Sequence, residues 1–236
     1  MKRILAILLL AGASVQAQNL LYDGNFQLAG QGHVNPGSAS IFNISAIQSG
    51  SSPIRGWQTT APDNQIEIWS SGFLSVPAPV SANYFAEINA NVVATLFQVV
   101  QLPDAAPVGF YLAHRARYVN IPGNDVMDLK IYDIGTDTSW SPSSSGALVY
   151  SQRFSDGQSD WGYYANTEIF TPKAGNYYAF TFDSVSSATY YAPGAGNFIG
   201  DVRFGYGVPE PSAASLLMAG LGGVIALRRI RKGVSI

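Results

Sequence analysis

The sequence predicts an all-β protein, an antiparallel β-sandwich of the jelly-roll kind. Charged residues make up only 12% of the chain and aromatic residues another 12%, with 24 glycines and 13 prolines. This balance is typical of short strands joined by turns rather than of packed helices. Apolar residues also alternate with polar ones through the middle of the chain, as they do on strands with one buried face.

The expected strands follow one another with no helix between them. Alternation is clearest in residues 127–132 and 178–183, where large apolar side chains occupy every second position. The other expected strands, in chain order, are residues 19–23, 41–47, 65–69, 84–89, 95–101, 110–119, 148–154, 161–170 and 197–204. The turn clusters PGSAS, APDN, IPGND, SPSSSG and APGAG separate them. About ten short strands imply a sandwich or jelly roll.

Charge and cysteine content narrow the class of partner. Residues 18–207 carry 14 acidic and 7 basic side chains, a formal charge of −7, although the whole chain carries only −2. An acidic domain repels a phosphate backbone, so nucleic acid is disfavoured as a partner. The chain has no cysteine, which excludes disulfides, thiolate metal sites and a cysteine nucleophile.

The first 17 residues have the three-part layout of a secretory signal peptide. Lys2 and Arg3 precede an apolar run, and small residues surround the expected cleavage point after Ala17. The alternative is a short buried helix at the start of the domain. We therefore expect an exported protein whose mature form begins near residue 18.

The other end of the chain combines prolines, a short apolar run and cations. Residues 213–227 contain no charge, and residues 228–232 contain four cations. A helix of this length rises about 22 Å, short of the ~30 Å hydrocarbon core, so it is a marginal transmembrane helix. The cations should stay in the cytoplasm, which places the preceding domain on the far side of the membrane.

This tail resembles the PEP-CTERM sorting signal of Gram-negative bacteria that make exopolysaccharide. The resemblance rests on Pro209, Glu210 and Pro211, followed by the short helix and the arginine-rich end. It implies processing by an exosortase near the prolines, transient anchoring in the inner membrane and release to the cell surface or extracellular matrix. The alternative is a plain single-pass anchor whose prolines form a linker.

A second resemblance concerns the domain itself. The segments NLLYDGNF, GWQT, IEIWSSGF, YFAEINAN, TLFQVV, AHRAR and NDVMDLKIYD run in the order seen in secreted bacterial proteins with a galactose-binding-like jelly roll of uncharacterised function. In those relatives a glutamate after the first-strand phenylalanine helps to bind structural calcium. This chain has Gln27 there, a poorer ligand, although Asp201 keeps the other expected oxygen. We therefore expect no cofactor and regard calcium as doubtful.

The expected organisation has three parts: a signal peptide (1–17), one sandwich domain (18–205) and a sorting tail (206–236). No motif for a nucleophile with its base or for a catalytic metal is present, and there are only two histidines. We expect His33 to be exposed in a glycine-rich loop. We expect His114 to lie on the inner face of its strand, hydrogen-bonded among apolar neighbours.

The opposite face of the strand that holds His114 is the candidate ligand site. If neighbouring strands share this face, acids, arginines and an aromatic ring gather in one outward patch: Glu67, Trp69, Glu87, Asn89, Arg115 and Arg117. Carboxylates and arginine can bind vicinal sugar hydroxyls while an aromatic face covers the axial C–H surface. The same patch can equally be a cross-strand ladder of ion pairs on a wet sheet.

Together these patterns predict an exported, non-catalytic module that associates with extracellular polysaccharide in a biofilm. The loop residues Trp140 and Tyr191 are further candidates for stacking on a sugar. A purely structural surface or adhesion protein is the first alternative. A glycan hydrolase with Glu67 and Glu87 as its acid and base is the second.

Overall fold

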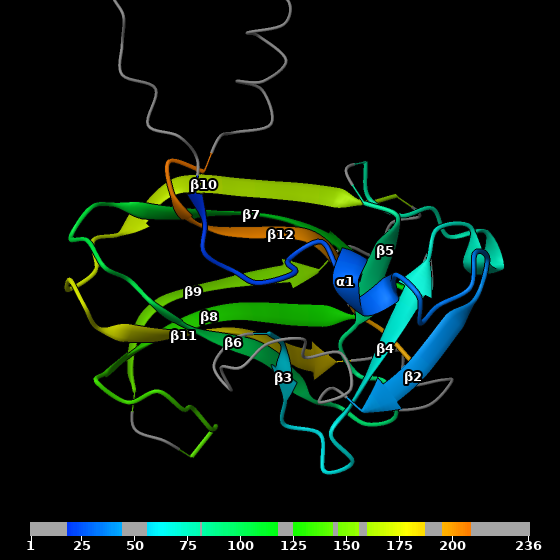
Figure 1. The fold of residues 1–236 in the computed structure, drawn as a ribbon, viewed down its shortest axis with the longest axis horizontal. Coiled ribbons are helices and arrows are strands. Elements are labelled where there is room, and N and C mark those ends of the chain that lie inside the picture. Colours follow the sequence, from blue (N-terminus) through cyan, green and yellow to red (C-terminus); the bar gives the residue numbers. More distant parts are fainter. Residues whose placement is uncertain are drawn as a thin grey trace, which may run out of the picture.

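The protein is an antiparallel β-sandwich in the part of the chain that the structure describes (Figure 1). This computed structural model describes residues 18–43, 56–80, 82–117, 125–143, 146–155, 160–186 and 195–208. The expected signal peptide and the tail with Pro209, Glu210 and Pro211 lie outside these residues. No helix in these ranges is both long enough and apolar enough to cross a membrane.

Two sheets face each other. The first contains β1 (Gln18–Asn19), β2 (Ala39–Asn43), β4 (Gln65–Ser70), β5 (Tyr84–Glu87), β7 (Val108–Arg115), β10 (Gly162–Phe170) and β12 (Phe198–Tyr206). The second contains β3 (Gln58–Thr59), β6 (Thr95–Gln101), β8 (Val126–Gly135), β9 (Ala147–Ser155) and β11 (Tyr177–Ser186). The first sheet runs in the order β10-β7-β12-β5-β4-β2 with β1 beside β12, and the second in the order β3-β6-β11-β8-β9. The chain thus crosses repeatedly between the layers, as in a jelly roll.

The main core lies between the two sheets, where the inward side chains of alternating strands meet. Phe180 of β11 stacks on Phe204 of β12 with ring centroids 4.7 Å apart, so the two layers are in direct contact. Phe110, Leu129 and Phe182 are among the other fully or almost fully buried members of this core. The period-two pattern of the sequence therefore identified the inward faces correctly.

Most expected strands are present, and the differences have local causes. The first strand is only β1, because the chain turns after it and Asp23 accepts hydrogen bonds from the backbone N–H groups of Leu28 and Ala29. These bonds hold the first turn of the short helix α1 (Gln27–Gly30), which the alternation did not predict. The two-residue strand β3 is too short to show alternation.

The outward face of the first sheet is not wet, contrary to the sequence prediction. A second apolar cluster covers it, built from Trp69, Val76, Phe85, Ala113, Trp161 and Phe198. The segment that contains the 3-10 turn η1 (Phe73–Ser75) folds over the sheet, and the indole N–H of Trp161 donates to the Pro77 carbonyl oxygen at 2.8 Å. Gly200 admits this segment, since a Cβ there would lie 2.6 Å from Cγ of Pro79. This face thus holds a small core of its own.

The contact between the two layers can be tested on β11. Phe180→Ala should lower the free energy of unfolding by about 3–5 kcal/mol, because it leaves a cavity between the sheets. Val185→Ala in the same strand, whose side chain is 45% exposed, should change it by less than about 0.5 kcal/mol. Urea unfolding at neutral pH measures both, and equal costs would contradict the assigned strand faces.

Candidate functional site

Three residues of the predicted patch, Glu67, Glu87 and Arg115, lie along one row of the first sheet. Glu67 of β4 faces Glu87 of β5, Glu87 faces Phe198 of β12, and Phe198 faces Arg115 of β7. Strand β12 thus separates β5 from β7, and Phe198 stands between Glu87 and Arg115 in this row. We call the six predicted residues the Glu87 cluster: Glu67, Trp69, Glu87, Asn89, Arg115 and Arg117.

Three members of the Glu87 cluster are linked directly around a buried ion pair. The Nη1 atom of Arg117 lies 3.1 Å from Oε1 and 2.9 Å from Oε2 of Glu87. The backbone N–H of Gly196 donates to Oε1 at 2.6 Å. The Arg117 guanidinium also lies 4.9 Å from the ring centroid of Trp69, within range of a cation–π interaction. Gly196 carries no side-chain signal that could have predicted its role.

Burial controls the protonation of Glu87. It raises the pKa of this carboxyl well above its usual range, and Arg117 opposes that rise only in part. Glu67 raises the pKa further, through its like charge and through a hydrogen bond between the two carboxyl groups. Burial and the like charge of Glu67 thus both favour the neutral form of the Glu87 carboxyl.

This geometry disfavours the hydrolase alternative. The acid and base of a glycosidase are about 5 Å apart in retaining enzymes and about 6.5–9.5 Å apart in inverting ones, because the reacting groups lie between them. Glu67 and Glu87 instead face each other directly on adjacent strands, and the buried Glu87 carboxyl is held by Arg117 and by the Gly196 N–H. The arrangement resembles a cross-strand polar network more than an acid–base pair.

Several polar atoms of the cluster are buried without a hydrogen-bond partner. Seven such side-chain atoms occur in the described part of the chain, and five of them belong to this cluster. They are Nε1 of Trp69, both Oδ1 and Nδ2 of Asn89, and Nε and Nη1 of Arg115. Buried polar atoms are almost always hydrogen-bonded in native proteins, to water or ligands where protein groups are missing. Their concentration on one face marks this cluster as the candidate binding site.

Trp69 and Arg115 are placed differently from the prediction. Trp69 is 1% exposed and packs against Phe73 and Phe198, with centroids 4.6 Å and 4.7 Å away, so its ring is not a free platform. Arg115 is 6% exposed, and burial lowers its pKa while the charge of Asp160 opposes that shift. Both side chains belong to the covered face because the segment with η1 closes over it.

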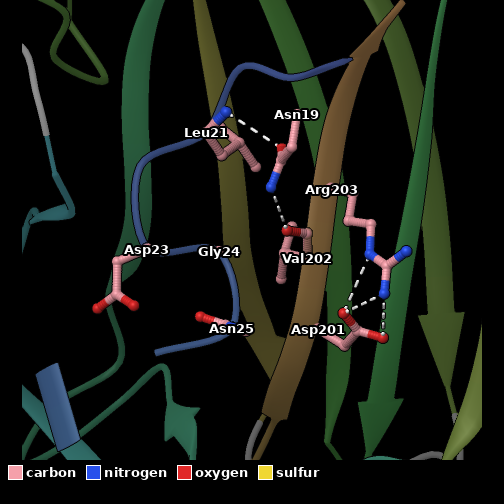
Figure 2. A pocket seen from close by; sticks show the side chains of 8 residues that line it. All are labelled: Asn19, Leu21, Asp23, Gly24, Asn25, Asp201, Val202 and Arg203. Carbon is pink, nitrogen blue, oxygen red and sulfur yellow. Dashed lines mark hydrogen bonds and ion pairs between the residues drawn. The ribbon is translucent and has the colours of Figure 1, made fainter. Parts of the chain in front are cut away.

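The expected calcium region is a polar cavity of about 240 Å³ between the N-terminal loop and β12 (Figure 2). Figure 2 shows the carboxylates of Asp23 and Asp201 pointing away from each other. Asp201 pairs with Arg203 at 2.9 Å, and Asp23 holds the first turn of α1. Gln27 is half-buried on that turn. The described residues contain no group of three or more His, Cys, Asp or Glu placed to hold a metal.

The other predicted candidates are accounted for separately. His33 is exposed, and His114 is fully buried with its Nε2 atom 3.0 Å from Oδ1 of Asn197, as predicted. Trp140 lies on the outward face of the second sheet and packs against Phe97 and Tyr132, with centroids 4.9 Å and 5.6 Å away. Its ring is 9% exposed, so it offers little stacking surface. Tyr191 lies outside the described residues.

Comparison with known proteins finds similar folds only. No family model and no curated protein matches the chain. The structure of TmCBM61 in complex with β-1,4-galactotriose has a TM-score of 0.47 and 14% identity, over 80% of this chain and 99% of that one. The C-terminal family 22 carbohydrate-binding module of Clostridium thermocellum Xyn10B has a TM-score of 0.41 and 8% identity, over 64% and 85%. A cleaved adhesin domain of Lys-gingipain from Porphyromonas gingivalis has a TM-score of 0.42 and 10% identity, over 72% and 99%.

The facing carboxyls predict a pH dependence. Because the pKa of Glu87 is raised on folding, its contribution to stability is complete below its ordinary pKa of 4.5 and is lost as pH rises through the raised value. Glu67→Gln removes the like charge, so the pKa of Glu87 should fall and the loss of stability above pH 5 should shrink. Each pKa unit corresponds to about 1.4 kcal/mol.

Urea unfolding of the wild type and the variant from pH 4 to pH 9 measures this difference. Glu168→Gln, at an exposed position of β10, is the matched control and should leave the pH profile unchanged. Identical profiles of stability against pH for Glu67→Gln and Glu168→Gln would contradict the effect of Glu67 on the pKa of Glu87.

Proposed function

We propose that the protein is a non-catalytic module that binds a saccharide of extracellular polysaccharide through the Glu87 cluster. The five buried, unpaired atoms of Trp69, Asn89 and Arg115 carry this proposal. Leaving such atoms unsatisfied costs about 1–3 kcal/mol each. A bound ligand that satisfies them would recover this free energy.

The unpaired atoms require a partner that offers both hydrogen-bond donors and acceptors. Oδ1 of Asn89 needs a donor, while its Nδ2 atom, the Trp69 indole and Arg115 need acceptors. A hydroxyl group both donates and accepts, so a ligand with several hydroxyls can serve both kinds of atom. A simple cation or anion would serve only one kind. Phe198 and Trp161 are buried on the same face and make the surroundings of these groups apolar.

A structural role without sugar binding is the second candidate. Leu74 and Val80 are 67% and 88% exposed on the segment that covers the outward face of the first sheet. Exposed apolar side chains on one segment favour contact with another protein surface. Sedimentation of the Leu74→Ser, Val80→Ser double variant tests this role, because loss of self-association with unchanged sugar binding would support it.

We also propose that the protein is exported and sorted by an exosortase. The basis is the sequence alone: the signal peptide, the Pro209–Pro211 motif, the short apolar segment and the basic end. These parts agree on a domain outside the cytoplasm that is held in the inner membrane only until its tail is cut. The module would then reach the cell surface or matrix, where polysaccharide is found.

Sugar binding can be tested on Asn89. Asn89→Leu removes both unpaired atoms at similar volume, so it should weaken binding to the native exopolysaccharide at least tenfold, as expected for loss of about 1.4 kcal/mol. The same change should leave the free energy of unfolding unchanged or increase it, because two unsatisfied buried atoms disappear. Pull-down and thermal unfolding of the full chain measure the two effects.

Asn91→Ala is the matched control for Asn89→Leu. Asn91 is exposed, and among the described residues its side chain bonds to those of Asp63 and Gln65, so its loss should not affect binding. Undiminished binding by Asn89→Leu would show that the cluster is not the sugar site. A gain in stability without any binding by the wild type would mean that the cluster holds only buried water.

Processing of the tail can be tested by intact mass. Protein isolated from its native host should lack the signal peptide and end near Pro211. A mass that retains the basic end would show a plain membrane anchor and would contradict exosortase processing.

A further inference from the structure

Arg115 differs from every other arginine in the described ranges. Arg117 pairs with Glu87, Arg153 with Asp128 and Arg203 with Asp201, at distances of 2.7–2.9 Å. Arg115 has no carboxylate within ion-pair distance among the residues described, and its Nε and Nη1 atoms have no hydrogen-bond partner. It is nevertheless one of the most buried, with 6% of its surface exposed.

An unpaired charge in a buried position is expensive. Guanidinium stays protonated under ordinary conditions, so Arg115 cannot avoid the cost by becoming neutral. Native proteins pair buried charges with opposite charges or bind ions with them. The negative charge of Asp160 acts on the pKa of Arg115, but Asp160 is exposed and makes no ion pair with Arg115. Among the described residues, Arg115 therefore lacks the anionic partner that a buried cation requires.

The sign of the local charge supports this conclusion. Arg117 is paired with Glu87, whereas Nε and Nη1 of Arg115 have no partner among the described residues. Within a domain of formal charge −7, Arg115 is therefore a positive charge without local compensation in the described ranges. Strand β12 separates Arg115 from Glu87, so their backbones lie about 10 Å apart, twice the strand spacing. An anion at Arg115 is kept away from the carboxyl pair.

We propose that the saccharide bound by the Glu87 cluster is anionic and that its carboxylate or sulfate ester pairs with Arg115. This inference rests on the proposed function, since it names the class of sugar that the same site takes. The hydroxyl groups of the sugar satisfy Asn89, and the anionic group satisfies Nε and Nη1 of Arg115. Neutral sugars lack the group that this buried cation requires.

The test compares saccharides that differ only in charge. The probes are oligomers of galacturonate and glucuronate, their methyl esters, a sulfated galactose oligomer and a neutral galactose oligomer of equal length. Calorimetric titration of the full chain should show binding to an acidic oligomer at least tenfold tighter than to its methyl ester. The uronate and sulfate probes distinguish the two sources of negative charge.

Two variants assign this preference to Arg115. Arg115→Gln should abolish the preference for the charged form, whereas Arg115→Lys, which keeps the charge, should retain part of it. Arg153→Gln removes a positive charge from an ion pair on the second sheet and should leave the preference for the charged saccharide unchanged. Thermal unfolding should show Arg115→Gln to be at least as stable as the wild type, because an unpaired buried charge has been removed.

The outcomes separate the two proposals. Equal binding of acidic, esterified and neutral oligomers, or a preference for charge that survives in Arg115→Gln, overturns the anionic assignment and leaves sugar binding intact. Absence of binding to every probe and to the native exopolysaccharide overturns both.

Discussion

Strand β12 is the element on which the rest of the structure depends, because both of its faces are buried. Its inward residue Phe204 stacks on Phe180 and joins the two sheets. Its outward residue Phe198 packs against Trp69 and Phe85 beneath the covering segment. Strand β12 pairs with β7 on one side and with β5 on the other, so it holds these two strands in the same part of the sheet. The Glu87 cluster exists because of that insertion.

Burial of the outward face changes the chemistry of the residues on it. On a wet sheet Glu67, Glu87 and Arg117 would form an exposed ladder that contributes little to stability. Beneath the covering segment Glu87 is fully buried, burial raises the pKa of its carboxyl, and Arg117 opposes that rise. Within the part of the chain that the structure describes, Asn89 and Arg115 are buried without equivalent partners. We interpret this imbalance as stability given up for binding, in agreement with the proposed function.

The fold was largely predictable, and the site was predictable in part. Residues 95–101 form β6 as predicted, and the inward faces of β8 and β11 follow the period-two pattern. The same pattern placed Arg115 and Arg117 opposite His114. The alternation could not show that residues 71–80 cover the outward face. Alternation identifies the side chains that point away from the main core, but it does not identify the segment that packs over them. The role of the Gly196 N–H was hidden for a related reason, since a backbone group carries no sequence signal.

The sequence by itself determined which segments form strands and which side chains share a face, because both depend on neighbours one or two positions away. It is also the only basis for the predicted export and processing signals. Only the tertiary structure decided the order of the strands, which sets Glu67 opposite Glu87 and places Arg115 away from every carboxylate partner in the described ranges. Strand order follows from the packing of segments far apart in the chain, so no local pattern contains it. For the same reason, only the folded structure shows that Arg115 is buried without an ion pair among the described residues.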